Sequence, residues 1–239
     1  MVSKNQIKRI TSLQQKKFRK QEQLFFVEGI KGIQELLDSN FELAELYTTN
    51  PELFAVDSSK VYTVSPAELQ KISALTTPNT CLALFKIPEV KAFEEKGLIL
   101  AVDDVRDPGN LGTIIRLCDW FGIKTLYCSE ESVDVYNPKV IQASMGAFLR
   151  IQVDYTDLKS YFQETRLPVF GALLEGENIY KTVVQPAGIL LMGNEGNGIS
   201  EELKQFITHP ISIPRRGGAE SLNVSIATGI LLSEFFRNV

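Results

Sequence analysis

The stretch Gly218-Ala219-Glu220-Ser221-Leu222-Asn223-Val224-Ser225-Ile226-Ala227 leads from an apolar segment into a helical pattern near the end of this 239-residue chain. Two other stretches also place a turn rich in glycine and asparagine after an apolar strand: Asp107-Pro108-Gly109-Asn110-Leu111-Gly112 and Met192-Gly193-Asn194-Glu195-Gly196. Ligands of open parallel sheets bind beyond the carboxyl ends of the strands, where loops lead into helices. The three turns together therefore predict one pocket assembled from several loops.

Strands and helices alternate around these turns in the C-terminal part of the chain. The predicted strands are apolar runs without an alternation of period two, at residues 98–102, 125–128, 169–174, 189–192 and 211–213. The predicted helices include residues 111–121 and 222–236. Apolar strands separated by helices are typical of a parallel sheet that is covered on both faces. We therefore expect an α/β fold for this part.

The N-terminal part alternates on a smaller scale. Residues 5–23 show a helix-compatible pattern, and further helices are expected at 30–37 and at 66–75, the latter with Ser65 as N-cap. Short strands are expected at residues 24–27, 43–47 and 61–64. Proline, charge and glycine between Lys86 and Gly97 mark a linker. We predict two domains, residues 1–92 and 93–239, with a boundary near residue 92.

Composition limits the class of protein. Hydrophobic residues make up 44% of the chain, which predicts a folded globular protein. No apolar run has the length of a membrane span, and no apolar stretch of the kind found in secretory signals follows Met1, so we expect a cytoplasmic protein. Cys81, Cys118 and Cys128 lack metal-ligand spacing and are interpreted as buried thiols. Because His209 is the only histidine, we expect no clustered zinc site and favour a structural role for it.

Charge is distributed unevenly along the chain. The net charge is −4, yet seven basic residues precede the first acidic residue, Glu22: Lys4, Lys8, Arg9, Lys16, Lys17, Arg19 and Lys20. A basic end on an acidic body is expected of a protein that contacts phosphates. A solubilising face on one helix is the alternative, and charge alone does not separate the two. The candidates for RNA contact are Lys16, Lys17, Arg19 and Lys20.

The turns leave several interpretations open. Asn110 suits the N-cap of the helix that follows it. Arg116, on the polar stripe of that helix, is either paired with a structural carboxylate or directed at a ligand. The turn at Gly193 lacks the GxGxxG order, and no Lys-Ser or Lys-Thr pair follows it as in a P-loop. It indicates either a backbone-lined pocket for an uncharged group such as adenine or a helix entry with Ser200 as N-cap.

Four motifs follow one another in the C-terminal part: Asn110-Leu111-Gly112 with Arg116, then Leu191-Met192-Gly193-Asn194-Glu195-Gly196, then Ile213-Pro214, then Ser221-Leu222-Asn223-Val224-Ser225-Ile226-Ala227. In this order they resemble the SpoU/TrmH family of RNA 2′-O-ribose methyltransferases, over about residues 97–239. In the N-terminal part, Lys17-Phe18-Arg19 and Leu24-Phe25-Phe26-Val27-Glu28-Gly29 look like a small RNA-binding domain, akin to a ribosomal protein, that precedes the catalytic domain in many members.

The resemblance implies a trefoil knot in the C-terminal domain, a homodimer, and S-adenosylmethionine as cofactor. It implies that the cofactor is held, mostly by backbone groups, at Ala172, Gly193, Ile213 and Leu222. Arg116 would activate the ribose 2′-hydroxyl, and the catalytic group would be completed by Asn110, Glu195, Ser221 and Asn223. The chain departs from the family at Arg215, where relatives often carry methionine or another apolar residue, and at Ala172, where many carry threonine.

The implied reaction is methyl transfer to RNA, and ribosomal RNA is favoured over transfer RNA because a separate domain precedes the catalytic one. The hydroxyl must lose its proton, and no histidine is well placed to take it. We therefore favour Arg116 as an electrostatic stabiliser of the oxygen over Arg116 as a base. Two alternatives stay open: a non-catalytic RNA-binding or ribosome-assembly protein on the same fold, and a nucleotide-dependent enzyme of doubly wound type. The second is disfavoured because the first turn lacks a glycine fingerprint.

Overall fold

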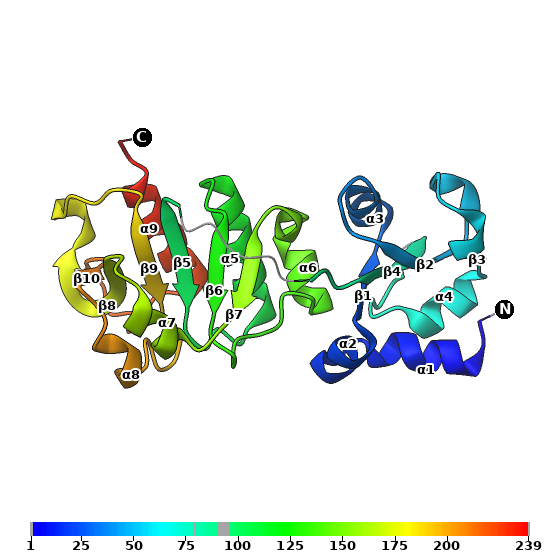
Figure 1. Cartoon of the computed structure of the whole chain (residues 1–239), viewed down its shortest axis with the longest axis horizontal. Coiled ribbons are helices and arrows are strands. Elements are labelled where there is room, and N and C mark those ends of the chain that lie inside the picture. Colours follow the sequence, from blue (N-terminus) through cyan, green and yellow to red (C-terminus); the bar gives the residue numbers. More distant parts are fainter. Residues whose placement is uncertain (1, 79, 90–95, 239) are drawn as a thin grey trace. The chain divides into compact units, whose positions relative to one another are not determined.

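The computed structural model describes residues 2–78, 80–89 and 96–238, and contacts divide the chain into two compact units. The first unit comprises residues 1–90 and 136–149, and the second comprises residues 91–135 and 150–239. Figure 1 labels the elements of both. The predicted boundary near residue 92 lies outside the described residues. The sequence pattern did not predict that residues 136–149 belong to the first unit.

The first unit contains a four-stranded sheet with the order β1-β4-β2-β3. Its strands are β1 (Leu24–Glu28), β2 (Leu43–Thr48), β3 (Val61–Thr63) and β4 (Cys81–Lys86). Strand β4 runs antiparallel to β1 and β2, whereas β2 and β3 are parallel. The helices of this unit are α1 (Lys4–Ser12), α2 (Lys16–Glu22), α3 (Ile30–Leu37), α4 (Pro66–Ile72) and α6 (Pro138–Ser144). The expected small α/β unit is confirmed.

Helices α1 and α4 contribute to one buried core with the sheet. This core includes Ile10, Leu13, Phe26, Tyr47, Leu69, Ile72, Leu82 and Leu84. Ser65 is the N-cap of α4, as expected, and forms a capping box with Glu68. The single helical segment expected at residues 5–23 is wrong in one respect: α1 ends at Ser12 with the fully buried Leu13 as its C-cap, and Gln15, which has an extended backbone, is the N-cap of α2.

An aromatic cluster of the first unit surrounds Phe25. Because side chains alternate across a strand, Phe25 points to the opposite face from Phe26. Its ring centroid lies 4.7 Å from that of Tyr136 and 6.2 Å from that of Phe148. Tyr136 and Phe148 lie on either side of α6, so a segment far along the chain completes the core beside β1.

The second unit contains a six-stranded sheet with the order β10-β8-β9-β5-β6-β7, and every pairing in it is parallel. Its strands are β5 (Leu98–Val102), β6 (Thr125–Cys128), β7 (Gln152–Tyr155), β8 (Val169–Asn178), β9 (Gly188–Met192) and β10 (His209–Ser212). Its helices are α5 (Pro108–Trp120), α7 (Leu158–Glu164), α8 (Glu201–Lys204) and α9 (Val224–Phe235). Strands β5 and β9 are buried throughout, as their apolar runs predict.

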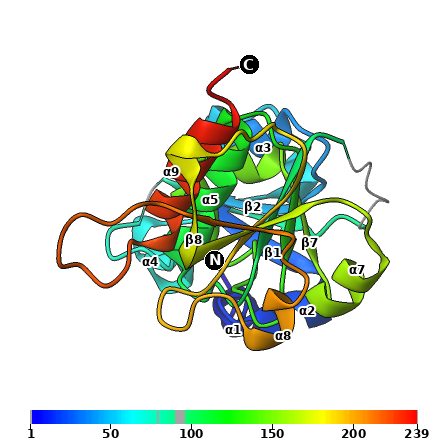
Figure 2. The same cartoon turned by 90° about the vertical axis from the view of Figure 1, so that its left-hand side faces the viewer.

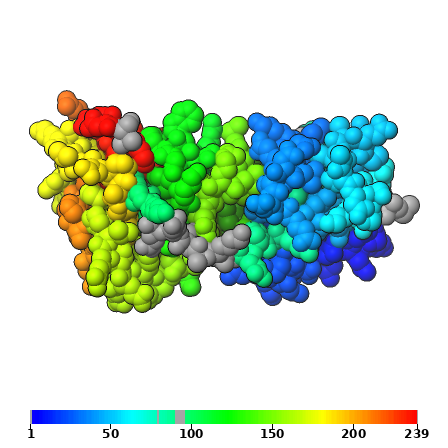
Figure 3. Space-filling view, turned by 45° about the horizontal axis from the view of Figure 1, so that its top comes forward, coloured from blue at the N-terminus to red at the C-terminus, as the bar shows by residue number. Residues whose placement is uncertain are grey.

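Helices cover both faces of this parallel sheet. Residues of α7 and α8 share a buried cluster with Val169 of β8. The next residue, Phe170, points to the opposite face and meets Phe235 of α9 edge-on, with 5.1 Å between ring centroids. Helix α9 also packs against α5, and its C-terminal end reaches the molecular surface, red in Figure 3. The predicted α/β architecture is confirmed.

Some elements differ from their predicted bounds. Strands β4 and β7 were not predicted: the four residues of β7 are only half-buried and include the polar Gln152 and Asp154, whereas residues 81–85 of β4 are all buried. Strand β8 continues to Asn178, beyond its apolar start. Between β10 and α9, residues 213–223 form a long loop that extends away from the rest of the second unit, dark orange in Figure 2.

Three further observations bear on the kind of protein. Over residues 2–78, 80–89 and 96–238, no helix combines the length and the apolar character needed to cross a membrane. In the same residues, no group of three or more His, Cys, Asp or Glu side chains is placed to hold a metal ion. All three cysteines are buried and none forms a disulfide, in agreement with their interpretation as buried thiols.

Candidate functional site

The turns identified in the sequence follow β5, β9 and β10 at the carboxyl edge of the second sheet. Strands β5 and β9 are neighbours, with Ala101 paired to Leu191, although β6 follows β5 in the chain. The winding direction of the sheet therefore reverses between β5 and β9. Doubly wound sheets bind ligands at such a switch point.

The N-terminus of α5 is capped by Asp107, not by Asn110 as the sequence analysis expected. The side chain of Asp107 accepts a hydrogen bond of 2.8 Å from the backbone N–H of Asn110, and Pro108 occupies the first turn. Asp107 takes this position because a residue directly before a proline at the first helical position is well placed to cap. The side chain of Asn110 is left available for contacts outside α5.

Asn110 connects two other loops by hydrogen bonds. Its Nδ2 donates to Oε1 of Glu195, which follows β9. Its Oδ1 accepts from Nδ2 of Asn223 at 2.9 Å and from Oγ of Ser225 at 3.3 Å. The structure thus brings together three of the residues that the resemblance implies as catalytic, from three separate turns. We refer to Asn110, Glu195 and Asn223 as the amide cluster.

The orientation of Asn223 is fixed by its role as N-cap of α9. Its Oδ1 accepts from the backbone N–H groups of Ser225 at 3.0 Å and Ile226 at 3.2 Å. Since that oxygen faces the helix, the Nδ2 of Asn223 is the atom that faces Asn110. The amide of Asn110 must then direct its own Nδ2 to the carboxylate of Glu195. The direction of every hydrogen bond in the amide cluster follows from the helix cap.

Ser225 is a member of this site that the sequence analysis did not select. It is buried, and its Oγ donates to Oδ1 of Asn223 at 2.6 Å in addition to its contact with Asn110. A serine two residues after an asparagine N-cap is the signal that could have identified it, because its hydroxyl is then next to the capping oxygen.

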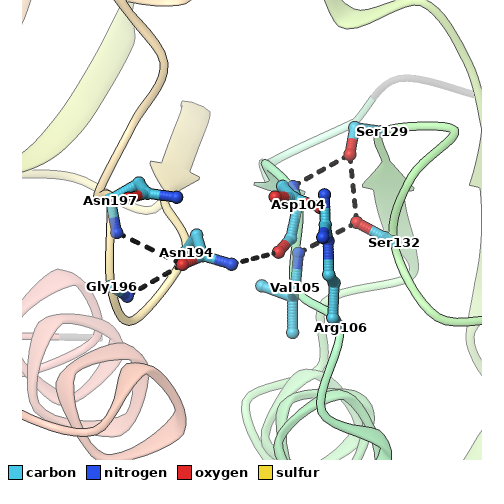
Figure 4. Close-up of polar contacts among 8 residues, drawn as sticks. All are labelled: Asp104, Val105, Arg106, Ser129, Ser132, Asn194, Gly196 and Asn197. Atoms are coloured by element: carbon cyan, nitrogen blue, oxygen red, sulfur yellow. Dashed lines mark hydrogen bonds and ion pairs between the residues drawn. The ribbon is translucent and has the colours of Figure 1, made fainter.

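The turn after β9 is closed tightly by its own backbone. Asn194 and Gly198 form an isolated antiparallel bridge, and Oδ1 of Asn194 accepts from the N–H of Gly196 at 2.8 Å (Figure 4). A Cβ atom at Gly193 would lie 2.2 Å from the backbone of Gly198 and of Ile199. No residue other than glycine fits at position 193 without displacing this turn.

The turns after β5 and β9 are joined directly. The Nδ2 of Asn194 donates to the carbonyl oxygen of Asp104 at 2.7 Å (Figure 4). The backbone N–H of Ser200 donates to Oδ2 of the buried Asp103 at 2.7 Å. Ser200 occupies the N-cap position of α8, which was one of the two interpretations of this turn, but its side chain makes no capping hydrogen bond.

The loop after β5 is further held by the loop after β6. Asp104 has the left-handed backbone conformation, with φ of 54°, and its N–H donates to Oγ of Ser129 at 2.9 Å. The N–H of Val105 donates to Oγ of Ser132, and the two serine hydroxyls are 3.1 Å apart (Figure 4). The ion pair with Asp104 raises the pKa of Arg106, whose side chain is exposed. Loops from three adjacent strands thus support one another.

The cofactor candidates lie on neighbouring strands at the same edge. Gly171 of β8 pairs with Leu191 of β9 on one side and with Pro210 of β10 on the other. Ala172 is the next residue of β8. The pairing of β8 with β10 then shifts, and residues 172–176 leave the ladder between Gly171 and Glu177. Gly193 and Ile213 follow β9 and β10 directly.

The hydrogen bonds described above for the amide cluster do not include Ser221, Leu222 or Arg116. Ser221 and Leu222 are exposed in the loop before Asn223. Arg116 is exposed on α5, six residues after Asn110. At 3.6 residues per turn this is about one and two-thirds turns, so Arg116 lies on a different face of α5 from Asn110.

The RNA-contact candidates of the first unit separate by burial. Lys17 and Lys20 are exposed and Lys16 is half-buried. Arg19 is only 1% exposed, and its Nη1 donates to the carbonyl oxygen of Leu13 at 2.7 Å. The prediction of Arg19 as an RNA contact does not fit this burial, because the guanidinium supports the turn between α1 and α2.

The cofactor candidates differ from a phosphate cradle and suit an uncharged ring. The cofactor candidates Ala172, Gly193, Ile213 and Leu222 include no basic residue. Leu222, directly before Asn223, is a large apolar side chain that is 47% exposed. An apolar side chain beside glycine-rich backbone suits the adenine ring, so these residues fit S-adenosylmethionine.

Two family models match the chain. The model of the SpoU rRNA Methylase family matches residues 97–233, which include the amide cluster, Arg116 and all four cofactor candidates. The model of the MRM3-like substrate binding domain matches residues 4–83, which include α1 and α2.

Individual proteins are similar over almost the whole chain. The 23S rRNA (guanosine(2553)-2′-O)-methyltransferase RlmP of Bacillus subtilis is 30% identical, over 96% of this chain and 96% of that protein. Among solved structures, a TrmH-family protein from Porphyromonas gingivalis is 41% identical with a TM-score of 0.90, over 100% of both chains. An AdoMet-bound rRNA methyltransferase from Sinorhizobium meliloti is 28% identical with a TM-score of 0.90, over 100% of this chain and 97% of the other.

Proposed function

The chain belongs to the SpoU rRNA methylase family, and on this premise we propose that it transfers a methyl group from S-adenosylmethionine to a ribose 2′-hydroxyl of ribosomal RNA. The observation that carries the proposal is the amide cluster, in which Asn110, Glu195 and Asn223 meet at the switch point of the sheet. These residues lie within the part of the chain that matches the family model.

S-adenosylmethionine would supply an electrophilic methyl group on a sulfonium, for which the ribose 2′-hydroxyl is the acceptor. The backbone at Ala172, Gly193, Ile213 and Leu222 holds the cofactor. Reactants held in line lower the barrier by about 7–11 kcal/mol in well-oriented systems. The role of the rigid turns is therefore to fix the two reacting atoms.

Arg116 stabilises the negative charge that develops on the ribose oxygen. A guanidinium stays protonated at neutral pH, so it acts as a fixed cation and not as a base. The amide cluster and Ser221 complete the site. Asn110 holds the carboxylate of Glu195 in place, and Asn223 holds Asn110, so these residues orient one another as well as the substrate.

The substrate is ribosomal RNA in preference to transfer RNA. RlmP, similar over 96% of this chain, is named for 23S rRNA, and residues 4–83 match a substrate binding domain. The exposed Lys17 and Lys20 of α2 provide positive charge on that domain. These two lysines contact RNA phosphates. The protein acts in the cytoplasm.

The active form is a homodimer. Trp120 at the end of α5 is 83% exposed, and Ile226 on the adjacent α9 is also exposed. Large apolar side chains on two packed helices mark a protein interface, and a second copy of the chain would cover them.

The second unit also has the trefoil knot of the family, an exception to the rule that chains do not thread their loops.

Methyl transfer is tested with the purified protein, labelled S-adenosylmethionine and ribosomal RNA that lacks the modification. The expected result is label in a nuclease-resistant 2′-O-methylated dinucleotide from ribosomal RNA and none from transfer RNA. A folded protein that binds RNA but neither binds S-adenosylmethionine nor transfers label would instead be the non-catalytic assembly factor on the same fold. Mapping of ribose methylation in cells without the protein identifies the nucleotide.

A further inference from the structure

The loop between β10 and α9 carries two adjacent arginines, Arg215 and Arg216, that the reaction described above does not use. The loop ends at Asn223, which belongs to the amide cluster. Residues 215–223 are all exposed, and Figure 2 shows this loop extending away from the second unit. A Cβ atom at Gly217 or Gly218 would meet no atom within 4 Å, so the loop stands clear of its neighbours.

Among the residues that the structure describes, no carboxylate pairs with either arginine. Three other arginines of the second unit are held in ion pairs: Arg106 with Asp104, Arg150 with Asp119, and Arg237 with Glu234. In the described residues, Arg215 and Arg216 form no ion pair, although Glu220 lies in the same loop. Acidic residues outnumber basic ones in the second unit, so this pair is a local positive charge on an acidic body.

The guanidinium of Arg215 is partly fixed in direction. Its Nη1 donates to the carbonyl oxygen of Ala219 at 3.2 Å, four residues before Asn223. The contact directs the side chain along the loop toward Ala219, which lies between Arg215 and Asn223 in the chain. The remaining N–H groups of Arg215 and all those of Arg216 are available to a ligand, and guanidinium N–H groups match the oxygens of phosphate in pairs.

We propose that Arg215 and Arg216 bind the backbone phosphates that flank the target ribose of the RNA substrate. The proposal rests on the proposed function, because it assigns these cations to the RNA of that reaction. Every internal ribose of RNA has a phosphate on each side, so two neighbouring guanidinium groups on the loop that ends at Asn223 match two anions of the same nucleotide. The carboxylate of S-adenosylmethionine is a single anion and would occupy only one of them.

The test compares the Arg215→Ala/Arg216→Ala double variant with Arg166→Ala in the full-length protein. Arg166 is a matched control because it is exposed and precedes β8, at the opposite edge of the same sheet. The KM for RNA is expected to rise about tenfold in the double variant, with kcat and the Kd for S-adenosylmethionine unchanged. The log–log salt slope of RNA binding should become shallower by about 0.7 for each phosphate that the variant no longer neutralises. Arg166→Ala should behave as wild type.

Each other outcome has a distinct meaning. If the double variant weakens S-adenosylmethionine binding and leaves RNA binding intact, the arginines serve the cofactor carboxylate and the proposal is wrong. If neither affinity nor the salt slope changes, the loop is not an anion site. If the wild-type protein binds RNA but transfers no methyl group, the proposed function fails, and the salt slope of RNA binding still decides whether these arginines contact phosphate.

Discussion

Asn223 donates a hydrogen bond of 2.9 Å to Asn110 across 113 residues of sequence, and the same side chain caps α9. One residue therefore has two separable tasks. Its Oδ1 stabilises the N-terminus of α9, and its Nδ2 orients Asn110 and through it Glu195. The two tasks predict different effects for two substitutions.

Asn223→Asp should keep the helix cap and disrupt the site. Aspartate is as good an N-cap as asparagine, but it has no N–H to donate to Oδ1 of Asn110. We expect thermal stability close to wild type and methyl transfer lowered about 10²-fold, because small displacements of reacting groups have effects of that size. Asn223→Ala should also lower the free energy of unfolding by about 0.5–2 kcal/mol. Full activity of the stable Asp variant would show that the hydrogen bond to Asn110 does not matter.

Arg116→Ala should lower methyl transfer strongly without affecting cofactor binding. Loss of one fixed group that stabilises an oxyanion lowers kcat by about 10²–10³-fold, whereas Arg116 is not among the residues that hold S-adenosylmethionine. Calorimetry with the cofactor and a single-turnover assay with ribosomal RNA separate the two effects. Lys124→Ala, at an exposed cation before β6, is the control. Unchanged turnover in Arg116→Ala would remove this residue from the mechanism.

Gly193→Ala should destabilise the second unit and weaken cofactor binding. The added Cβ would lie 2.2 Å from backbone atoms of Gly198 and Ile199, which cannot move as a side chain could. Overpacking of this kind costs about 1–3 kcal/mol. Gly218→Ala is the matched control, since nothing lies within 4 Å of its added Cβ. Denaturant unfolding of both variants measures the difference, and equal stabilities would contradict the tight turn.

Ile226→Asp should convert the dimer to a monomer. A carboxylate placed in an apolar interface loses its hydration without gaining a partner. Sedimentation velocity at micromolar concentration measures the change. Val183→Asp, at a valine that is 93% exposed, is the control and should leave the wild-type distribution unchanged. A wild-type protein that sediments as a monomer would contradict the proposed homodimer directly.

Charge reversal at Lys17 and Lys20 should weaken RNA binding in a salt-dependent way. These lysines are exposed on α2, and neutralised phosphates release counterions on binding. We expect lower affinity for ribosomal RNA and a shallower salt slope, measured by filter binding at several salt concentrations. Reversal at Lys71, an exposed lysine of α4, serves as a control for a change of net charge of the same sign. An unaffected affinity would mean that the basic face only aids solubility.

Much of the fold could be predicted because apolar runs report burial directly. The strands β5 and β9 are fully buried and their bounds follow from their sequences. Strand β7 has half-buried residues at the sheet edge and gives no such signal. The helix cap at Asp107 was missed because Asp107 and Asn110 are both good capping residues, and only the position of Pro108 separates them.

The site could be predicted as a set of residues but not as a network. The turns placed Asn110, Glu195 and Asn223 at one edge of the sheet, whereas the order of their hydrogen bonds depends on the cap of α9. Burial of Arg19 could not be read from a basic run, because its partner is the carbonyl group of Leu13. Sequence shows which side chains are charged but not which backbone acceptors they meet.

The aromatic contacts of Phe25 with Tyr136 and Phe148 limit how freely this protein could have been assembled by recombination. A gene segment ending near residue 92 would encode the four-stranded sheet with Phe41 and Phe85 beside Phe25 but without Tyr136 and Phe148, and the remaining segment would carry these two rings without their partner. Exchange of N-terminal modules between relatives thus demands matched changes at positions 136 and 148. The two halves are expected to have been inherited together.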